Sequence, residues 1–425
     1  MNVQDLHSLF LQHPSITTDT RKIIKGAIFF ALKGANFNGN SYAETALAHG
    51  ASYAVIDEEE YHVNDKTILV EDTLAMLQAL ANYHRLRFNA KIIGLTGSNG
   101  KTTTKELIFE VLKKKYHTIA TKGNLNNHIG VPLTLLTIQP ETELAIIEMG
   151  ANHQKEIEFL CRIAQPDFGY ITNFGKAHLE GFGGVEGVIK GKSELYDHLT
   201  EHKKSIFLNA DDPIQVQKLA TYPKKYGFSG SDRNYYRIQL KEANPFVTLS
   251  VEHTTITSKL IGAYNFQNCC AAVIMGKYFN IPLEEIKAAI EHYSPENNRS
   301  QIIERDGHYI ILDAYNANPT SMKAALESFN LMTHHHKVLI LGDMFELGDA
   351  AEMEHQAIAE FIETLVFDTV LLVGEHFFRT QSKAKKLKDF EALKDYLNEH
   401  TLKNTSAILI KGSRGMALER ALAVL

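Results

Sequence analysis

The sequence predicts an α/β protein built from three domains. Strand-like apolar segments alternate with amphipathic helical segments from about residue 90 onward, which favours mostly parallel sheets with helices on both faces. A chain of 425 residues is long enough for about two to four domains with ample core. We expect a small N-terminal α/β domain over residues 1–88, a central parallel-sheet domain over 89–298 and a C-terminal Rossmann-like domain over 299–425.

The N-terminal segment contains two predicted strands and one predicted helix. Ala27–Leu32 and Ala51–Ile56 are apolar runs of strand length, and Thr73–Arg85 has apolar residues at helical spacing. The polar stretch Arg85–Asn89 precedes the next predicted strand, so we place the first domain boundary there.

The central and C-terminal segments repeat the alternation of strands and helices. Residues 235–261 show β-type alternation, which predicts an antiparallel edge or an appended sheet. The predicted central strands are Leu144–Glu148, Phe168–Thr172 and Ser205–Leu208, with helices at Gln154–Ala164, Val185–Leu199, Tyr264–Phe279 and Leu283–Tyr293. The predicted C-terminal strands are Tyr309–Asp313, Val338–Leu341, Val370–Val373 and Ala407–Ile410, with helices between them.

The composition is that of an ordinary globular protein. Hydrophobic residues make up 44% of the chain and the formal net charge is −6, so there is no basic field for sequence-independent nucleic-acid binding. The odd cysteine count (Cys161, Cys269 and Cys270) implies no disulfide framework and favours a reducing compartment. The first residues do not resemble a signal peptide, and no apolar run approaches the roughly 18 residues of a membrane span. We expect a cytoplasmic protein with no nucleic-acid partner and no membrane insertion.

Residues 94–104 carry the clearest chemical signal, a glycine loop followed by lysine and threonine. A strand-like approach precedes this loop and a helical pattern follows it, which is the context of a phosphate-binding loop. Gly97 and Gly100 would let backbone N–H groups turn toward an anion, and the helix N-terminus adds positive potential. Lys101 would then meet the terminal phosphates, and the Thr102 hydroxyl would hold Mg²⁺.

The spacing of this loop differs from the generic phosphate-binding pattern, because position 95 is leucine. The alternative is an ordinary glycine turn before a helix, which the adjoining Lys-Thr pair disfavours. We therefore expect a bound nucleoside triphosphate. The loop residues predicted to bind it are Gly97, Ser98, Asn99, Gly100, Lys101, Thr102 and Thr103.

Further polar side chains stand near the ends of other predicted strands. Glu148 offers a carboxylate suited to Mg²⁺, although a solvated strand-end carboxylate explains it equally well. His178 is either a metal or phosphate partner or an ordinary loop histidine. The amide of Asn268 suits adenine or a helix cap, and Asp313 suits ribose hydroxyls. By charge alone, Lys192 belongs to a solvated helix face.

Taken together and in this order, these residues resemble the Mur ligase family, the ATP-dependent amide-forming enzymes of peptidoglycan synthesis. The resemblance covers essentially the whole chain, and the family spacing accounts for the departure from the generic loop. The matching features are Thr96–Thr103, Asn173–His178, the Lys192 segment, Asn265 with Asn268, and Arg299. Gly123–Asn127, Glu148–Asn152, Asp313–Pro319 and Gly342–Gly348 indicate the branch of the family that adds D-alanyl-D-alanine. The Asp-Asn-Pro-Arg loop of the diaminopimelate-adding branch is not found.

The resemblance implies an ATP- and Mg²⁺-dependent ligase that joins D-alanyl-D-alanine to UDP-N-acetylmuramoyl-tripeptide. The tripeptide carboxylate would be phosphorylated, and the dipeptide amine would displace phosphate from the acyl phosphate. A monomer is also implied. The resemblance implies catalytic roles for Lys101, Glu148, His178 and Lys192, and metal binding by Thr102, Glu148, His178 and a carbamylated Lys192.

The resemblance also distributes the substrates over the three domains. Asn268 would face the adenine, while Arg299 and Asp313 would bind the nucleotide from the C-terminal domain. The UDP-linked substrate would contact the N-terminal domain and the Gly123–Asn127 loop. The residues implied in binding this substrate or the dipeptide are Thr20, Arg21, Gly34, Asn36, Asn126, Asn127, Asn318 and Ser321.

Three other functions fit parts of the same pattern. Folylpolyglutamate synthase shares the ligase architecture, but the Asp313–Pro319 loop and the N-terminal block argue against it. A P-loop NTPase that drives a conformational change would hydrolyse ATP without an amine acceptor. A binding-only relative would have lost the catalytic groups, which are all present here.

Overall fold

The computed structural model describes residues 1–400, 402–403 and 405–425. They form two compact units, each assembled from separate stretches of chain. Unit 1 contains Met1–Leu95, Tyr116–Gly150 and Glu156–Gly169, and unit 2 contains Thr96–Lys115, Ala151–Lys155 and Tyr170–Leu425. The predicted α/β class is confirmed in both units, whereas the division into three domains stays a prediction. None of the helices in the described residues is long and apolar enough to cross a membrane.

The N-terminal part of unit 1 is a small parallel sheet. Its order is β1 (Ile16–Thr17), β2 (Ile28–Phe30), β5 (Tyr53–Ile56) and β6 (Thr67–Leu69), and all three pairings are parallel. The predicted strands appear as β2 and β5. The sequence did not predict β1 and β6, because two or three residues are too few to show alternation. The remaining elements are α1 (Val3–Gln12), α2 (Ala43–Ala48), α3 (Thr73–Arg87) and the hairpin of β3 (Lys33–Gly34) and β4 (Phe37–Asn38).

Unit 1 also contains the strand that leads to the glycine loop, up to Leu95, together with two neighbouring strands. β7 (Lys91–Thr96) and β8 (Thr118–Ala120) both pair in parallel with β9 (Leu144–Glu148). Every residue of β9 is buried, which explains why it reads as a continuous apolar run. α5 (Gly130–Leu135) and α6 (Glu156–Ala164) complete this part, and both pack against α3.

Unit 2 begins with the glycine loop and the helix that follows it. The strands β11 (Ser205–Asn209), β12 (Lys225–Ser229) and β13 (Tyr236–Glu242) are parallel, and β14 (Phe246–Val251) and β15 (Thr254–Ile261) extend them in antiparallel pairs. The antiparallel addition predicted over 235–261 is confirmed. β10 (Phe168–Ile171) is divided between the units. The helices are α4 (Lys101–Leu112), α7 (Leu179–Phe182), α8 (Val185–Glu201), α9 (Pro213–Lys218), α10 (Tyr264–Tyr278) and α11 (Leu283–His292).

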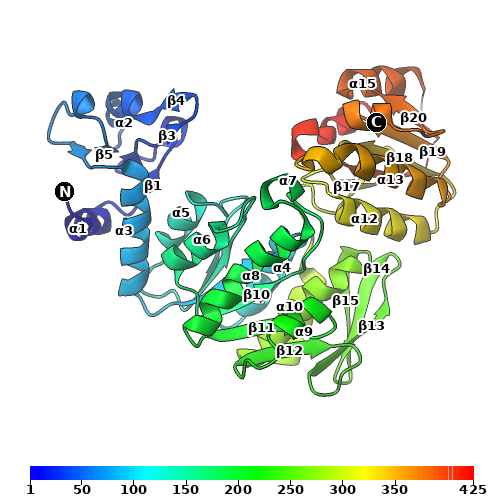
Figure 1. The fold of residues 1–425 in the computed structure, drawn as a ribbon, viewed down its shortest axis with the longest axis horizontal. Coiled ribbons are helices and arrows are strands. Elements are labelled where there is room, and N and C mark those ends of the chain that lie inside the picture. Colours follow the sequence, from blue (N-terminus) through cyan, green and yellow to red (C-terminus); the bar gives the residue numbers. More distant parts are fainter. Residues whose placement is uncertain (401, 404) are drawn as a thin grey trace. The chain divides into compact units, whose positions relative to one another are not determined.

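The C-terminal part of unit 2 is a six-stranded sheet in the order β16-β17-β21-β18-β19-β20. The strand β16 is antiparallel to β17, and the remaining pairs are parallel. Helices cover both faces, with α15 on one side and α12 and α13 on the other (Figure 1). The bounds are β16 (Gln301–Arg305), β17 (His308–Asp313), β18 (Lys337–Gly342), β19 (Thr369–Val373), β20 (Lys385–Leu387), β21 (Ala407–Lys411), α12 (Pro319–Leu331), α13 (Ala351–Glu363), α14 (Glu375–Arg379) and α15 (Phe390–Glu399).

Candidate active site

The glycine loop has a backbone that only glycine tolerates at two positions. Gly97 has φ +139° and Gly100 has φ +78°, in regions that other residues rarely adopt. A Cβ atom at Gly97 would lie 2.0 Å from Thr172 Oγ1, and one at Gly100 would lie 2.6 Å from Asn268 Oδ1. The loop therefore turns tightly against its neighbours before α4 starts at Lys101.

The segment after β10 packs directly on this loop. The backbone N–H of Asn99 donates to Asn173 Oδ1 at 3.0 Å, and Thr172 Oγ1 donates to the Asn99 carbonyl at 2.6 Å. Ser98 Oγ donates to the Gly175 carbonyl at 2.8 Å. The loop after β10 therefore lies against the glycine loop.

The Lys101 ammonium lies over the glycine loop. Its Nζ donates to the Gly97 carbonyl at 2.7 Å and to the Ser98 carbonyl at 3.3 Å. The next residue, Thr102, is 3% exposed in the first turn of α4. A fixed ammonium and a buried hydroxyl at a helix N-terminus suit a polyphosphate and its Mg²⁺.

Glu148, at the end of β9, is held by the predicted substrate loop. The Glu148 side chain is buried, and its Oε1 accepts a hydrogen bond from Asn126 Nδ2 at 2.8 Å. The Asn126 carbonyl accepts from the Gly150 N–H at 2.7 Å, and Asn127 Oδ1 accepts from the Gly130 N–H at 2.9 Å. Hard oxygen donors at this strand end fit Mg²⁺. Glu148 belongs to unit 1, whereas Thr102, His178 and Lys192 belong to unit 2.

Lys192 corrects one expectation from the charge pattern. It is fully buried in α8 instead of lying on a solvated face. Its Nζ donates to the Ala151 carbonyl at 3.0 Å and lies 4.9 Å from the centroid of the Phe182 ring. The charge pattern failed because α7, which packs against α8, covers this face of the helix.

His178 contacts a carboxylate of the C-terminal part of unit 2. Its Nδ1 lies 2.6 Å from Glu346 Oε2, and both residues have left-handed backbones, with φ 53° and 63°. The close side-chain contact with His178 lowers the pKa of the Glu346 carboxyl. Sequence reasoning did not select Glu346, although it lies inside the Gly342–Gly348 segment that carried the resemblance.

The predicted adenine contact, Asn268, is buried between α10 and α4. Its Oδ1 accepts from Thr104 Oγ1 at 2.9 Å, and its Nδ2 donates to Asn265 Oδ1 at 2.8 Å. The structure therefore brings Asn268 to the glycine loop and gives both ends of its amide internal partners.

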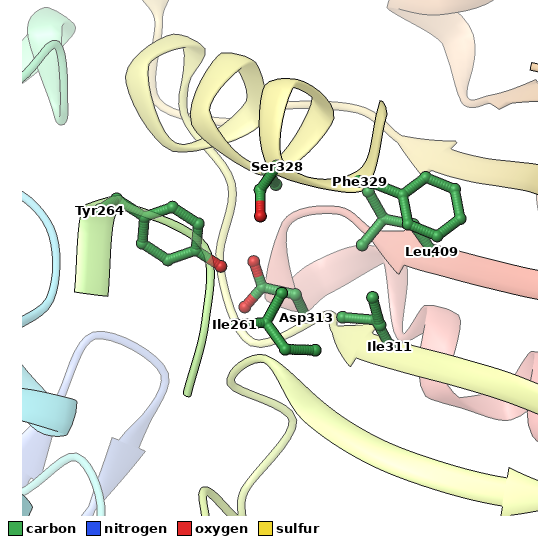
Figure 2. Close-up of a pocket in the computed structure, with 8 residues that line it drawn as sticks. Ile261, Tyr264, Ile311, Asp313, Ser328, Phe329 and Leu409 are labelled. Carbon is green, nitrogen blue, oxygen red and sulfur yellow. The ribbon is translucent and has the colours of Figure 1, made fainter. Parts of the chain in front are cut away.

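Asp313, at the end of β17, receives two hydrogen bonds. Its Oδ2 accepts from Lys411 Nζ at 2.5 Å and its Oδ1 from the Ser300 N–H at 3.1 Å. Figure 2 shows its carboxylate and the Tyr264 hydroxyl pointing toward one another in a small pocket. Burial is the main cause that raises the pKa of the Tyr264 phenol, and Asp313 adds to it. The sequence placed Lys411 in a polar loop at the end of an apolar strand but assigned it no role.

The remaining predicted residues are placed in several ways. Asn318 forms a capping box with Ser321 at the start of α12, and its Nδ2 donates to Asn99 Oδ1 at 2.6 Å. The Arg299 guanidinium lies 3.6 Å from the centroid of the Tyr315 ring.

Arg21 forms an exposed pair with Asp19, which lowers the pKa of that carboxyl to about 2. Thr20 lies in the same turn as Arg21, and Gly34 and Asn36 lie in and beside the β3–β4 hairpin.

A glycine loop between a parallel strand and a helix, with Lys-Thr at the helix start, defines a P-loop nucleotide-binding protein. The chain also matches three Mur ligase domain models, one over residues 14–85 (catalytic domain), one over 95–276 (middle domain) and one over 298–422 (glutamate ligase domain). The chain belongs to the Mur ligase family.

Two similar proteins bear the name UDP-N-acetylmuramoyl-tripeptide–D-alanyl-D-alanine ligase. The protein from Bacillus subtilis is 37% identical over 95% of this chain and 91% of its own length. The Escherichia coli protein is 35% identical over 97% of this chain and 93% of its own.

Two solved structures have a similar fold along nearly the whole chain. MurF from Acinetobacter baumannii has a TM-score of 0.86 at 31% identity, over 96% of this chain and 92% of its own. The MurF ligase from Thermotoga maritima, in complex with ADP, has a TM-score of 0.85 at 26% identity, over 97% of each chain.

Proposed function

We propose that this chain is an ATP-dependent ligase that joins D-alanyl-D-alanine to UDP-N-acetylmuramoyl-tripeptide, giving the pentapeptide precursor of peptidoglycan. The observation that carries the proposal is the P-loop geometry in a chain similar along nearly its whole length to ligases of that name. These substrates favour a cytoplasmic enzyme, and we propose that it acts as a monomer.

The proposed reaction has two steps. The tripeptide carboxylate attacks the γ-phosphorus of ATP, so that ADP leaves and an acyl phosphate forms. The dipeptide amine then attacks the acyl carbon, and phosphate leaves with the C–O bonding pair while the nitrogen loses a proton. Both steps depend on positioning and on stabilisation of phosphate charge, which the P-loop N–H groups and Lys101 would supply.

The candidate metal ligands have the chemistry of a Mg²⁺ site. Mg²⁺, when bound, neutralises phosphate charge, and Thr102 and Glu148 are the oxygen donors we assign to it, together with His178. Lys192 would be a further metal ligand if carbamylated. Carbamylation changes its ammonium, which repels a cation, into a carboxylate-like group, which binds one. The full burial of Lys192 supports a special role, since an ordinary lysine is rarely removed from water.

The substrate contacts follow the domain assignment. We place the UDP-linked substrate on the N-terminal sheet, near Arg21 and the β3–β4 hairpin. We assign the nucleotide to the P-loop with Asn268, Arg299 and Asp313. Asn318 supports a place for the dipeptide near the reaction centre, because its amide reaches Asn99 of the P-loop.

The test is phosphate release with ATP, Mg²⁺ and UDP-N-acetylmuramoyl-tripeptide, with and without D-alanyl-D-alanine, followed by mass spectrometry. The expected result is turnover that requires the dipeptide and yields a UDP-linked pentapeptide. ATP hydrolysis at a rate that neither substrate changes would instead indicate a P-loop NTPase without ligase activity. Activity only on a folate with glutamate would indicate folylpolyglutamate synthase.

A further inference from the structure

The loop after β18 holds Glu346 in a fixed and strained conformation. Met344 and Leu347, on either side of Glu346, are buried. The Met344 N–H donates to His355 Nε2 at 2.9 Å. The Phe345 N–H donates to Ser413 Oγ at 2.8 Å. Glu346 itself has φ 63°, a conformation that costs a residue with a side chain about 1 kcal/mol or more. Anchors on both sides therefore maintain a backbone that the glutamate would not adopt by itself.

This strained loop presents the carboxylate to the reaction centre. Glu346 Oε2 lies 2.6 Å from His178 Nδ1, while the side chain keeps 49% of its surface exposed. Among the described parts of the chain, no residue donates a hydrogen bond to its Oε1. The Glu180 N–H donates to the Glu346 carbonyl at 3.4 Å, which fixes the loop against α7. Lys101 lowers the pKa of the Glu346 carboxyl further, so this carboxylate also lies within the field of the P-loop lysine.

The Glu346 carboxylate would repel the phosphates that Lys101 is proposed to bind. The proposed reaction, however, also brings a cation to the acyl phosphate, because the free amine of a dipeptide is an ammonium at neutral pH. An anionic side chain beside the phosphate-binding groups suits that ammonium, since charge-assisted hydrogen bonds are the strong ones. The half-exposed side chain of Glu346 leaves room for that ammonium beside the carboxylate.

We propose that Glu346 binds the ammonium group of the incoming dipeptide and so selects an amine as the second substrate. This inference rests on the proposed function and adds a residue for the amine to it. The carboxylate acts by binding and orienting the nitrogen, while the phosphoryl chemistry stays with the P-loop.

The chain supplies a matched control for this role. Glu354 on α13 also pairs with the loop after β10, through Lys176 Nζ at 2.6 Å, but its side chain is only 8% exposed. Both carboxylates therefore contact the same segment from the C-terminal part of unit 2, and only Glu346 is open to a ligand. E346Q and E354Q each remove one charge and keep the shape of the side chain.

The experiment measures KM for D-alanyl-D-alanine, ATP and the UDP-tripeptide, and the Mg²⁺ requirement, in the wild type, E346Q and E354Q. We expect E346Q to raise KM for the dipeptide at least about tenfold, about 1.4 kcal/mol of binding, with the other constants within about twofold. E354Q should leave the dipeptide KM unchanged. Hydroxylamine, which is mostly uncharged at neutral pH, should still trap the acyl phosphate in E346Q at the wild-type rate.

Three results would overturn the inference. An equal rise of the dipeptide KM in E346Q and E354Q would show that Glu346 only docks the loop. A raised Mg²⁺ requirement with an unchanged dipeptide KM would make Glu346 a metal-site residue. An unchanged dipeptide KM in an E346Q protein with wild-type thermal unfolding would remove the role altogether. A wild-type enzyme with no dipeptide-dependent turnover would instead refute the proposed function.

Discussion

At the scale of single residues, Lys101 is the side chain on which turnover should depend most. Its ammonium is fixed over the P-loop carbonyls and forms no part of the core. We expect K101A to lower kcat at least about a hundredfold, as loss of one charge-stabilising donor does elsewhere, and to leave the melting temperature close to that of the wild type. Steady-state kinetics and thermal unfolding check both parts, and full activity in K101A would refute the P-loop assignment.

Lys411 is the second residue whose replacement should have a large effect, here on both stability and ATP binding. It is buried and pairs with Asp313 at 2.5 Å, so K411M leaves that carboxylate without its cation. We expect K411M to lose about 3 kcal/mol of stability and to raise KM for ATP. The double variant D313N/K411M should recover most of the stability and none of the ATP affinity. Chemical denaturation and ATP titration separate the two effects.

At the scale of elements, the P-loop shows how a backbone conformation limits sequence. G97A places a Cβ atom 2.0 Å from Thr172 Oγ1 at a φ of +139°, so the loop must move away from the segment after β10. We expect G97A to weaken nucleotide binding at least about tenfold, because the loop N–H groups lose their alignment. Isothermal titration with ADP measures this, and G123A, where a Cβ atom meets open space, is the control. Equal affinity in wild type and G97A would contradict the close packing.

The loop before α5 contacts Glu148, a proposed metal ligand, through a single amide. N126A removes the hydrogen bond to Glu148 Oε1 and leaves a buried carboxylate less fixed. We expect a raised Mg²⁺ requirement with an unchanged KM for the dipeptide, because outer partners of metal ligands tune metal affinity about 10- to 100-fold. Activity measured against Mg²⁺ concentration tests this. If only KM for the UDP-tripeptide rose, Asn126 would contact substrate, as the resemblance implies.

Local sequence predicted the longer elements and the P-loop, but not the features that depend on distant segments. Buried strands such as β9 and amphipathic helices carry their own periodicity. The short strands β1, β6 and β8 have too few residues to show a periodic pattern. They form because neighbouring strands pair with them. Lys192 looks like a surface residue until α7 covers α8. The partners of Glu346 and Lys411 lie 168 and 98 positions away (346 − 178 and 411 − 313), which no local pattern reports.

At the scale of the whole molecule, unfolding should depend on pH through a histidine pair in unit 1. His84 Nε2 lies 2.8 Å from the Ile138 carbonyl and must donate to it, so His84 Nδ1 accepts from His7 Nε2 at 3.0 Å. This arrangement links α1 to α3 and requires the His84 ring to be neutral, because its Nδ1 must accept. Burial is the main cause that lowers the pKa of both imidazoles, and Arg87 lowers that of His7 further.

The direction of the pH effect on stability follows from proton uptake. The unfolded histidines take up protons near pH 6.5, while the folded ones do so only at lower pH. Stability is therefore complete above about pH 6.5 and falls as the pH drops through that value. We expect the melting temperature to fall between pH 7.5 and 5.5, and to fall less in H7Q, whose amide can donate to His84 without titrating. Because a chain with two compact units need not unfold in one step, calorimetry should resolve the transition that H7Q changes. An equal fall in melting temperature in H7Q and the wild type would show that other groups cause the pH dependence.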